Sequence, residues 1–291
     1  MTRRIAAALV LLTLGLVVPS GAVSAAASRP SAGTTAPKAS PLAQAHAHND
    51  YEHARPLQDA LDHGFTSVEA DVWLVGGELL VGHDVTDLVP GRTLQSLYLD
   101  PLIQRVREHG GEVYSGHDEP LQLLIDIKNT GAATYTQLDQ VLSQYRRILT
   151  RYAGQRVVER AVSVVVSGDR PRALMEAQKV RLASYDGRLT DLGSGAPASF
   201  VPLISSNWNS TFTWQGVGEM PADQRAALHR ISETAHANGQ RVRFWATPDV
   251  PGAAREAVWA ELLAAGVDHV NTDDLPGLRA YLLAQHARAA A

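Results

Sequence analysis

The sequence has 291 residues, a net charge of -4 and no cysteine. The lack of thiols excludes disulfides, a cysteine nucleophile, a thiolate zinc site and a lipid-bearing cysteine. A mildly acidic chain without runs of lysine or arginine argues against nucleic-acid binding and against docking on anionic membranes.

Residues 1–27 have the pattern of a secretory signal peptide. Arg3 and Arg4 precede the apolar run Ile5–Val18, and small residues follow. The run is shorter than the about 20 apolar residues that a membrane-spanning helix needs. We therefore expect cleavage at 25–27, an extracytoplasmic location, no stable membrane anchor after cleavage, and a mature chain that is more negative because both arginines are lost.

Residues 28–41 predict a disordered linker, since they are mostly Ala, Ser, Thr, Pro and Gly without an apolar period. The rest, residues 42–287, has the usual length of one α/β barrel. Short apolar runs alternate there with helical patterns, which is typical of a parallel sheet. We predict a single (β/α)₈ TIM barrel, expected to be a monomer, with strands at 42–48, 66–73, 122–128, 160–167, 181–185, 202–206, 241–246 and 268–272.

Apolar spacing predicts helices between these strands. One helix face carries Leu138, Val141, Leu142, Tyr145 and Leu149, and another carries Leu228, Ile231 and Ala235. Gly239 and Gly266 stand where helices are expected to end in a left-handed residue. A small insertion is expected after the second strand, with a hairpin turned by Gly76-Gly77 into residues 79–82 and a helix at 97–108.

Acidic side chains are spaced to face the barrel mouth. Glu69 and Asp71 alternate with outward apolar residues on the predicted second strand, and Asp126 and Lys128 do so on the third. Burying unpaired carboxylates is unfavourable, so a bound cation or a shared proton is the expected compensation. Three oxygen ligands from neighbouring strands suit Mg²⁺ or Ca²⁺. The alternative is that Lys128 neutralises the acids in a salt bridge.

Histidines supply the candidate acid/base groups, because imidazole titrates near neutral pH. His46 and His48 share a face at the end of the first strand, and His83 ends the predicted hairpin. Asp84 is available to orient the ring of His83. The histidines predicted to be surface or cap residues are His63, His109, His229, His236 and His286.

The chain resembles the superfamily of glycerophosphodiester phosphodiesterases and phosphatidylinositol-specific phospholipase C-like barrels. The branch that it resembles most includes the fungal altered-inheritance-of-mitochondria protein six. The resemblance covers about residues 45 to 285, and its specific part is the Glu-x-Asp strand with the following His-Asp pair. The strings that carry it are HAHNDYEHARPL (46–57), SVEADVWL (67–74), ELLVGHD (78–84), LLIDIKN (123–129), RFWATPD (243–249) and VNTDDL (270–275).

The resemblance implies a metal-dependent phosphoric diester hydrolase with a TIM barrel. Its acid/base histidines would be His83 and a residue of the first strand, where His46 and His48 both qualify; we favour His46, because Asn49 then matches an Asn of sphingomyelinase-D-like barrels. The cation would be held by Glu69, Asp71 and Asp126. The chain lacks the His-Arg-Gly and Pro-Glu-Asn-Thr motifs of the core enzymes, so a phosphate contact is missing. The expected substrate is a small-molecule or lipid-derived phosphodiester of unspecified identity.

Further polar residues are expected at the substrate. Arg243 and Trp245 alternate on the seventh strand and are predicted as a phosphate clamp and an apolar wall, with Trp245 as barrel filler the equal alternative. Asn49 and Lys128 complete the predicted substrate-binding set. Strands six and eight end in Asn207, Asn271 and Asp273, where polar residues commonly contact a ligand; Asp273 or Asp274 could instead cap the last helix.

Two other functions fit parts of the pattern. His46-x-His48 is also typical of amidohydrolase- and polymerase-histidinol-phosphatase-type metal barrels. Those sites need further histidines on later strands, and strands four to seven offer none. The third reading is a non-catalytic barrel that binds a phosphorylated or sugar ligand.

Overall fold

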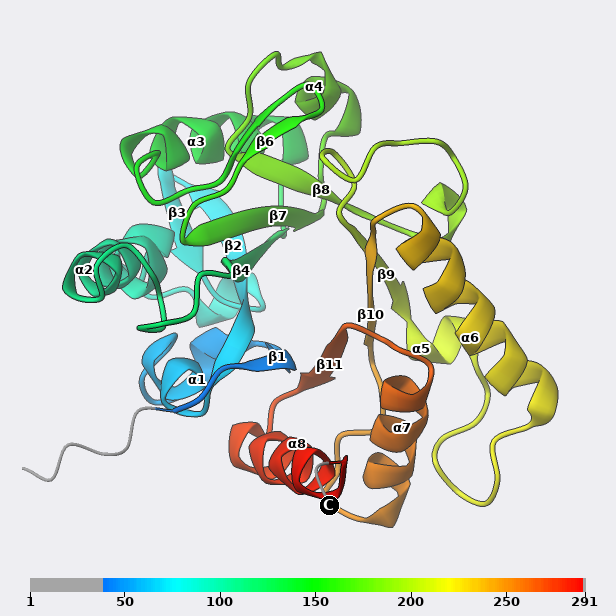
Figure 1. The fold of residues 1–291 in the computed structure, drawn as a ribbon. Coiled ribbons are helices and arrows are strands. Elements are labelled where there is room, and N and C mark those ends of the chain that lie inside the picture. Colours follow the sequence, from blue (N-terminus) through cyan, green and yellow to red (C-terminus); the bar gives the residue numbers. More distant parts are fainter. Residues whose placement is uncertain (1–38, 290–291) are drawn as a thin grey trace, which may run out of the picture. The chain divides into compact units, whose positions relative to one another are not determined.

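The computed structural model describes residues 39–289, which form a closed barrel of parallel strands (Figure 1). Neighbouring strands follow the order β1-β11-β10-β9-β8-β7-β4-β2, and pairing of β1 with β2 closes the ring. The predicted TIM barrel is confirmed, and each predicted strand lies within two residues of an observed one. The barrel strands are β1 Leu42–Ala47, β2 Phe65–Val75, β4 Leu121–Ile127, β7 Val162–Gly168, β8 Ala183–Gly187, β9 Leu203–Asn207, β10 Arg241–Trp245 and β11 His269–Thr272.

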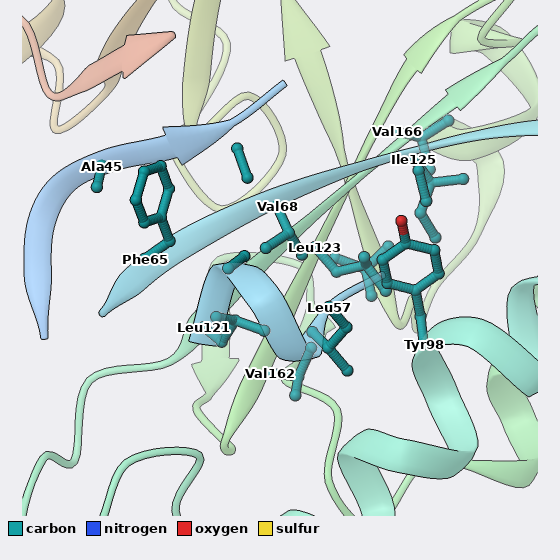
Figure 2. Packing of buried hydrophobic residues seen from close by; sticks show 14 of the residues in the cluster. Ala45, Leu57, Phe65, Val68, Tyr98, Leu121, Leu123, Ile125, Val162 and Val166 are labelled. Carbon is teal, nitrogen blue, oxygen red and sulfur yellow. The ribbon is translucent and has the colours of Figure 1, made fainter. Parts of the chain in front are cut away.

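Alternation along the strands separates an apolar outer layer from a polar barrel interior. On β2, Val68, Ala70 and Val72 are completely buried in the main core, whereas Glu69 and Asp71 belong to the opposite strand face. Figure 2 shows part of this main core, with side chains from the strands and from the surrounding segments packed together. The helix-facing core therefore holds the strands, and the inner face is left to polar groups.

Helices surround the strands, as Figure 1 shows. Gly239 (φ 70°) and Gly266 (φ 74°) follow the ends of α6 and α7 in the left-handed conformation that the sequence predicted. The helices are α1 Gln58–Asp62, α2 Asp100–Glu108, α3 Gly131–Gln144, α4 Arg172–Ala177, α5 Trp208–Thr211, α6 Ala222–Ala237, α7 Ala253–Ala264 and α8 Leu275–Ala289, with short 3₁₀ turns η1 Asp50–Glu52, η2 Val85–Asp87 and η4 Leu189–Asp191.

The insertion after β2 contains the predicted hairpin and helix. Strand β3 (Glu78–Val81) pairs antiparallel with the end of β2, and Gly76 and Gly77 make the turn at positive φ. The helix begins earlier than predicted, as the π-helical turn η3 (Gln95–Leu99), and continues into α2. The hairpin places His83 two residues after the end of β3, beside Asp71 of β2.

One helix prediction extends too far. Helix α3 ends at Gln144, so Leu149 does not lie on the predicted helix face. Leu149 instead forms a parallel β-bridge with Val162 at the start of β7, where it is completely buried. An apolar residue at helical spacing is thus buried through sheet pairing. The sequence analysis also did not predict the small hairpin that follows, in which β5 (Arg151–Ala153) pairs with β6 (Arg156–Val158).

Within residues 39–289, no helix combines the length and the apolar character needed to cross a membrane. The predicted signal peptide at 1–27 and all but the last three residues of the predicted linker at 28–41 lie outside the described residues.

Candidate active site

A cavity of about 180 Å³ opens at the C-terminal ends of the barrel strands. In TIM barrels this face is where catalytic residues gather. Non-glycine residues with left-handed backbone follow three of these strand ends, namely Asn49 (φ 45°), Thr130 (φ 41°) and Ala246 (φ 56°). Strained backbone of this kind clusters at functional sites. The cavity is lined by His48, Asn49, Glu69, His83, Asp126, Lys128, Ser167, Arg188, Arg243 and Trp245.

The three predicted cation ligands converge at this cavity. Glu69, Asp71 and Asp126 each offer a carboxylate oxygen, and these oxygens lie within 4.8 Å of one another. The parallel register explains the convergence, because Asp71 on β2 is the Cα partner of Asp126 on β4. In the part of the chain that the structure describes, this is the only such group of three or more His, Asp or Glu side chains. A histidine-rich metal centre of the amidohydrolase type is therefore not favoured.

One carboxylate oxygen of the trio supports cation binding directly. Asp71 Oδ1 is buried and has no hydrogen-bond partner among residues 39–289, while Asp71 Oδ2 is fully engaged. A buried acceptor without a donor is unfavourable unless something else satisfies it. A hard divalent cation takes oxygen ligands of this kind. The residues present therefore fit a divalent cation at Glu69, Asp71 and Asp126.

The electrostatics of the trio favour an additional positive charge. Burial, and then the charge of Asp71, raise the pKa of Asp126 to about 7. Burial, and then the charge of Glu69, also raise the pKa of Asp71. Burial acts to raise the pKa of Glu69 too, but the charge of Arg243, the hydrogen bond with His46 and the charges of His48 and His46 together outweigh it and lower that pKa. Two of the carboxyl groups thus resist ionisation until more positive charge reaches them.

Lys128 supplies part of that charge. Its Nζ lies 2.8 Å from Asp71 Oδ2 and 3.4 Å from Asp126 Oδ1. Burial acts to lower its pKa, but the charges of Asp126 and Asp71 outweigh this and raise it. The predicted salt bridge is therefore present, and it leaves Asp71 Oδ1 unsatisfied.

His83 is oriented by a carboxylate other than the predicted one. Its Nδ1 lies 3.2 Å from Asp71 Oδ2, and its side chain is half exposed at the cavity. The Asp84 side chain makes no hydrogen bond or ion pair with His83 in the described part of the chain; Asp84 instead precedes η2 and forms a capping box with Asp87 at its end. A carboxylate only accepts, so Nδ1 carries the proton and the Nε2 lone pair is free.

The two histidines of β1 lie at different depths. His48 lines the cavity, and its Nδ1 lies 2.8 Å from Asp273 Oδ1. Burial acts to lower the pKa of His48, but the hydrogen bond to Asp273 and the charges of Glu69 and Asp273 together outweigh it, and the pKa is raised. His46 is completely buried and does not line the cavity, and burial with the charge of Arg243 lowers its pKa to about 3. Its Nε2 lies 3.2 Å from Glu69 Oε2.

Two protein-family models match segments of the sequence that carry residues of this cavity. The AIM6-like phosphodiesterase domain matches residues 38–186, which carry the carboxylate trio, Lys128 and the histidines at the cavity. The chain belongs to this family. A second match, to the glycerophosphoryl diester phosphodiesterase family, covers residues 241–276 with Arg243 and Trp245. The predicted resemblance is confirmed.

Two of the similar proteins come from fungi. The chain is 32% identical to altered inheritance of mitochondria protein 6 of Eremothecium gossypii, over 80% of this chain and 68% of that protein. It is 30% identical to the homolog of Arthroderma benhamiae, over 81% of this chain and 82% of that protein. A glycerophosphoryl diester phosphodiesterase structure from Parabacteroides distasonis is 12% identical, with a TM-score of 0.48 and coverage of 86% and 88%.

The predicted substrate-binding residues Asn49, Lys128, Arg243 and Trp245 all line the cavity, but Arg243 is already bonded to other side chains. Arg243 donates from Nη2 to Glu69 (2.5 Å) and from Nε to Asn271 (2.9 Å) and is 3% exposed. Its guanidinium therefore serves Glu69 rather than standing free as a phosphate clamp. Trp245 is part of the cavity wall, and Asn49 lies beside it in the lining.

The other strand-end residues have structural partners. Asn207 caps the short helix α5, where its side chain accepts from the Asn209 N–H. Asp274 accepts from the Gly277 N–H at the start of α8, so it is Asp274 rather than Asp273 that caps this helix. Asp273 instead bonds to His48.

Three contributors were missed by the sequence analysis. Tyr51 donates its hydroxyl to Asp71 Oδ2 (2.7 Å) from the loop after β1. Arg188, just after β8, stacks over Trp245 at 4.8 Å and donates from Nη1 to the fully buried Asp186 (2.6 Å). A β-carbon on Gly168 would collide with Asp126 Oδ1. The available signals were the position of Tyr51 inside HAHNDYEH and of Asp186 and Arg188 at the end of a predicted strand.

Proposed function

We propose that this chain is an exported phosphoric diester hydrolase that depends on a divalent cation, Mg²⁺ or Ca²⁺. The observation that carries the proposal is the convergence of Glu69, Asp71 and Asp126 at a cavity that also presents His48 and His83. Membership of the AIM6-like phosphodiesterase domain family supports the reaction class. The substrate would be a small or lipid-derived phosphodiester, and the active unit would be a monomer.

The cation would neutralise charge on the phosphate oxygens as these develop negative charge. Lys128 adds positive charge beside the carboxylates that would hold the cation, and Arg188 also lines the cavity. Fixed positive groups of this kind stabilise a transition state without reorganising. Trp245 supports the Arg188 guanidinium through its ring face.

His83 and His48 divide the proton transfers. His83 Nδ1–H donates to Asp71, so the free Nε2 accepts the proton of the attacking hydroxyl or water. His48 bonds to Asp273 and its pKa is raised, which favours the protonated ring, so His48 donates the proton to the leaving oxygen. His46 is not available for this step, because both ring nitrogens are already engaged and the ring is completely buried. This assignment replaces our initial preference for His46.

The test is hydrolysis of bis(p-nitrophenyl) phosphate and of glycerophosphodiesters by the purified protein with Mg²⁺ or Ca²⁺. His83→Ala and His48→Asn are expected to lower the rate by about 10²- to 10⁴-fold each, and chelation is expected to abolish it. His286→Ala on the exposed face of α8 is the control and retains activity.

Three outcomes count against the proposal. An unchanged rate after chelation or in His83→Ala refutes the mechanism. A loss confined to His46→Asn, with His48→Asn fully active, shows that the first-strand assignment is wrong. Tight binding of phosphodiesters without turnover favours the non-catalytic barrel instead.

Export is proposed from the N-terminal sequence pattern alone. Fractionation of the source cells, followed by N-terminal sequencing of the recovered protein, is expected to find a chain that begins close to residue 28. Recovery of an uncleaved chain from the cytoplasm would contradict it.

A further inference from the structure

A line of hydrogen bonds crosses the barrel interior and ends on the cation ligand Glu69. Arg241 on β10 donates from Nη2 to Gln122 Oε1 on β4 (2.7 Å), and Gln122 Nε2 donates to Ser67 Oγ on β2 (2.8 Å). Ser67 Oγ lies 2.7 Å from His46 Nδ1, and His46 Nε2 lies 3.2 Å from Glu69 Oε2. Strands β10 and β4 lie far apart in the ring order, so the line spans the barrel.

Every intermediate member of this line is shielded from water. Ser67, Gln122 and His46 are each 0% exposed, and Glu69 is 5% exposed. Buried polar groups must find their partners within the protein. Their donors and acceptors therefore match one another, and no water competes for them.

The two ends of the line allow only one direction of donation. Arginine has donors only, so the Gln122 oxygen must face Arg241 and the Gln122 amide N–H must face Ser67. Ser67 then accepts from Gln122 and has its own hydroxyl proton left for His46 Nδ1. At the other end, the Glu69 carboxylate is ionised beside Arg243 and accepts only, so His46 Nε2 must carry a proton.

We propose that Arg241, Gln122 and Ser67 fix His46 as the Nε2–H tautomer, and that His46 in turn holds Glu69 in the orientation that binds the cation. This makes His46 a positioning residue. The inference rests on the proposed function for the identity of Glu69 as a cation ligand. The tautomer itself follows from the hydrogen bonds alone and can be measured without turnover.

The decisive variant is Gln122→Glu. A carboxylate at this position accepts from Arg241 and also from Ser67, so the Ser67 hydroxyl proton turns away from His46. Ser67 Oγ then accepts from His46 Nδ1, and because the neutral ring carries a single proton, Nε2 gives up its own proton and with it the bond to Glu69. In ¹⁵N-histidine NMR spectra, where protonated and unprotonated ring nitrogens are well separated, we expect a protonated Nε2 and a bare Nδ1 in the unsubstituted protein and a protonated Nδ1 in Gln122→Glu.

Ser67→Ala tests the same line by removing one member. Calorimetric titration with Mg²⁺ and, separately, with Ca²⁺ is expected to show an about 10-fold weaker affinity, the lower end of the effect of losing a direct partner of a metal ligand, because Ser67 supports Glu69 through His46. Ser184→Ala is the matched control, because its buried hydroxyl inside the barrel donates to the Val164 carbonyl, outside the line. That variant is expected to bind the cation like the unsubstituted protein.

The outcomes separate this inference from the proposed function. Unchanged His46 nitrogen signals in Gln122→Glu, or an equal loss of affinity in Ser67→Ala and Ser184→Ala, would overturn the inference even if the enzyme hydrolyses phosphodiesters. A protein that binds neither cation fails the proposed function and with it the role of Glu69, whereas the tautomer shift in Gln122→Glu is still decided by the spectra. Circular dichroism of each variant verifies that the barrel is folded.

Discussion

Tyr51 connects the loop after β1 to the centre of the site. Its hydroxyl donates to Asp71 Oδ2, the same oxygen that His83 and Lys128 approach. Tyr51→Phe removes this donor and keeps the ring. Because a hydrogen bond to a charged group contributes about 1.5–3 kcal/mol, we expect a roughly 10-fold or greater loss in cation affinity and in kcat/KM, measured by titration and by initial rates.

Tyr114→Phe is the control for that prediction. The Tyr114 hydroxyl is also buried and donates to the Phe65 carbonyl, away from the cavity. Its loss is expected to lower the unfolding temperature with no effect on cation affinity. Equal cation affinities in the two variants would show that Tyr51 has no special role at Asp71.

Arg188 is the residue best placed to replace the phosphate contact that the missing His-Arg-Gly motif would provide. Asp186 is completely buried and accepts from Ser167, Ser205 and Arg188, so it holds the guanidinium at the cavity wall. Arg188→Lys loses the planar stacking on Trp245. We expect the KM for a phosphodiester to rise about 10-fold or more, since the lost charge-assisted bond contributes about 1.5–3 kcal/mol, with a smaller change in kcat.

Steady-state kinetics check the Arg188 prediction, with Arg172→Lys as the matched substitution. Arg172 also stacks on an aromatic ring, that of Tyr185, and pairs with Asp191, but it does not line the cavity. The KM of Arg172→Lys for the same phosphodiester is expected to stay unchanged. A fall in kcat with an unchanged KM in Arg188→Lys would contradict a binding role.

At the level of elements, the close approach of β7 to β4 shapes the cation site. Gly168 ends β7 at φ 69°, and a β-carbon added there would collide with Asp126 Oδ1 and with the Ile127 carbonyl oxygen. Gly168→Ala would push Asp126 away from Glu69 and Asp71. We expect cation affinity to fall by at least about 10-fold, as for other changes that displace a metal ligand or its support, measured by calorimetric titration.

Gly193→Ala is the control that separates the steric clash with Asp126 from the backbone strain of a left-handed alanine. Gly193 has the same φ of 69°, but nothing lies within 4 Å of an added β-carbon. A left-handed alanine costs about 1–2 kcal/mol in either place, so both variants lose stability. Only Gly168→Ala should lose cation affinity; equal titration curves would show that the contact with Asp126 is unimportant.

The strands and their inward carboxylates were predictable because a two-residue period reports directly which side chains share a face. The same period placed His46 and His48 on one face, but two residues of strand advance the chain by about 6.6 Å. That step separates a completely buried ring from one at the cavity. Depth along the barrel axis depends on strand register and on the loops above, which periodicity does not report.

The partners of site residues were the part that sequence could not supply. Asp84 was expected to orient His83 because it is adjacent in the chain, but the carboxylate that reaches the ring is Asp71, 12 residues away. Arg243 was expected at a phosphate, but it pairs with Glu69, 174 residues away. Such contacts follow from closure of the barrel, which brings β10 and β2 to a common interior.

For the whole molecule, buried acids make stability depend on pH. Burial raises the pKa of Asp126 to about 7, and burial likewise raises the pKa of Asp50, in the loop after β1, to about 7, against 3.8 for an ordinary Asp. A raised folded pKa means that the folded state holds its proton longer. The resulting stabilisation is complete below about pH 4 and is lost as the pH rises towards 7.

Between pH 5 and pH 7.5, we therefore expect the unfolding temperature of the chelated protein to fall by at least about 2–4 °C, the shift that about 1 kcal/mol produces in a chain of this size. Saturating Mg²⁺ or Ca²⁺ should reverse part of this fall, because a cation stabilises the ionised form of Asp126. Calorimetry of two variants shows how much of this dependence on pH and on the cation comes from Asp126 and how much from Asp50. Asp126→Asn should lose the cation-dependent gain and part of the pH dependence, whereas Asp50→Asn should lose only part of the pH dependence. A full cation-dependent gain in Asp126→Asn would place the ion elsewhere.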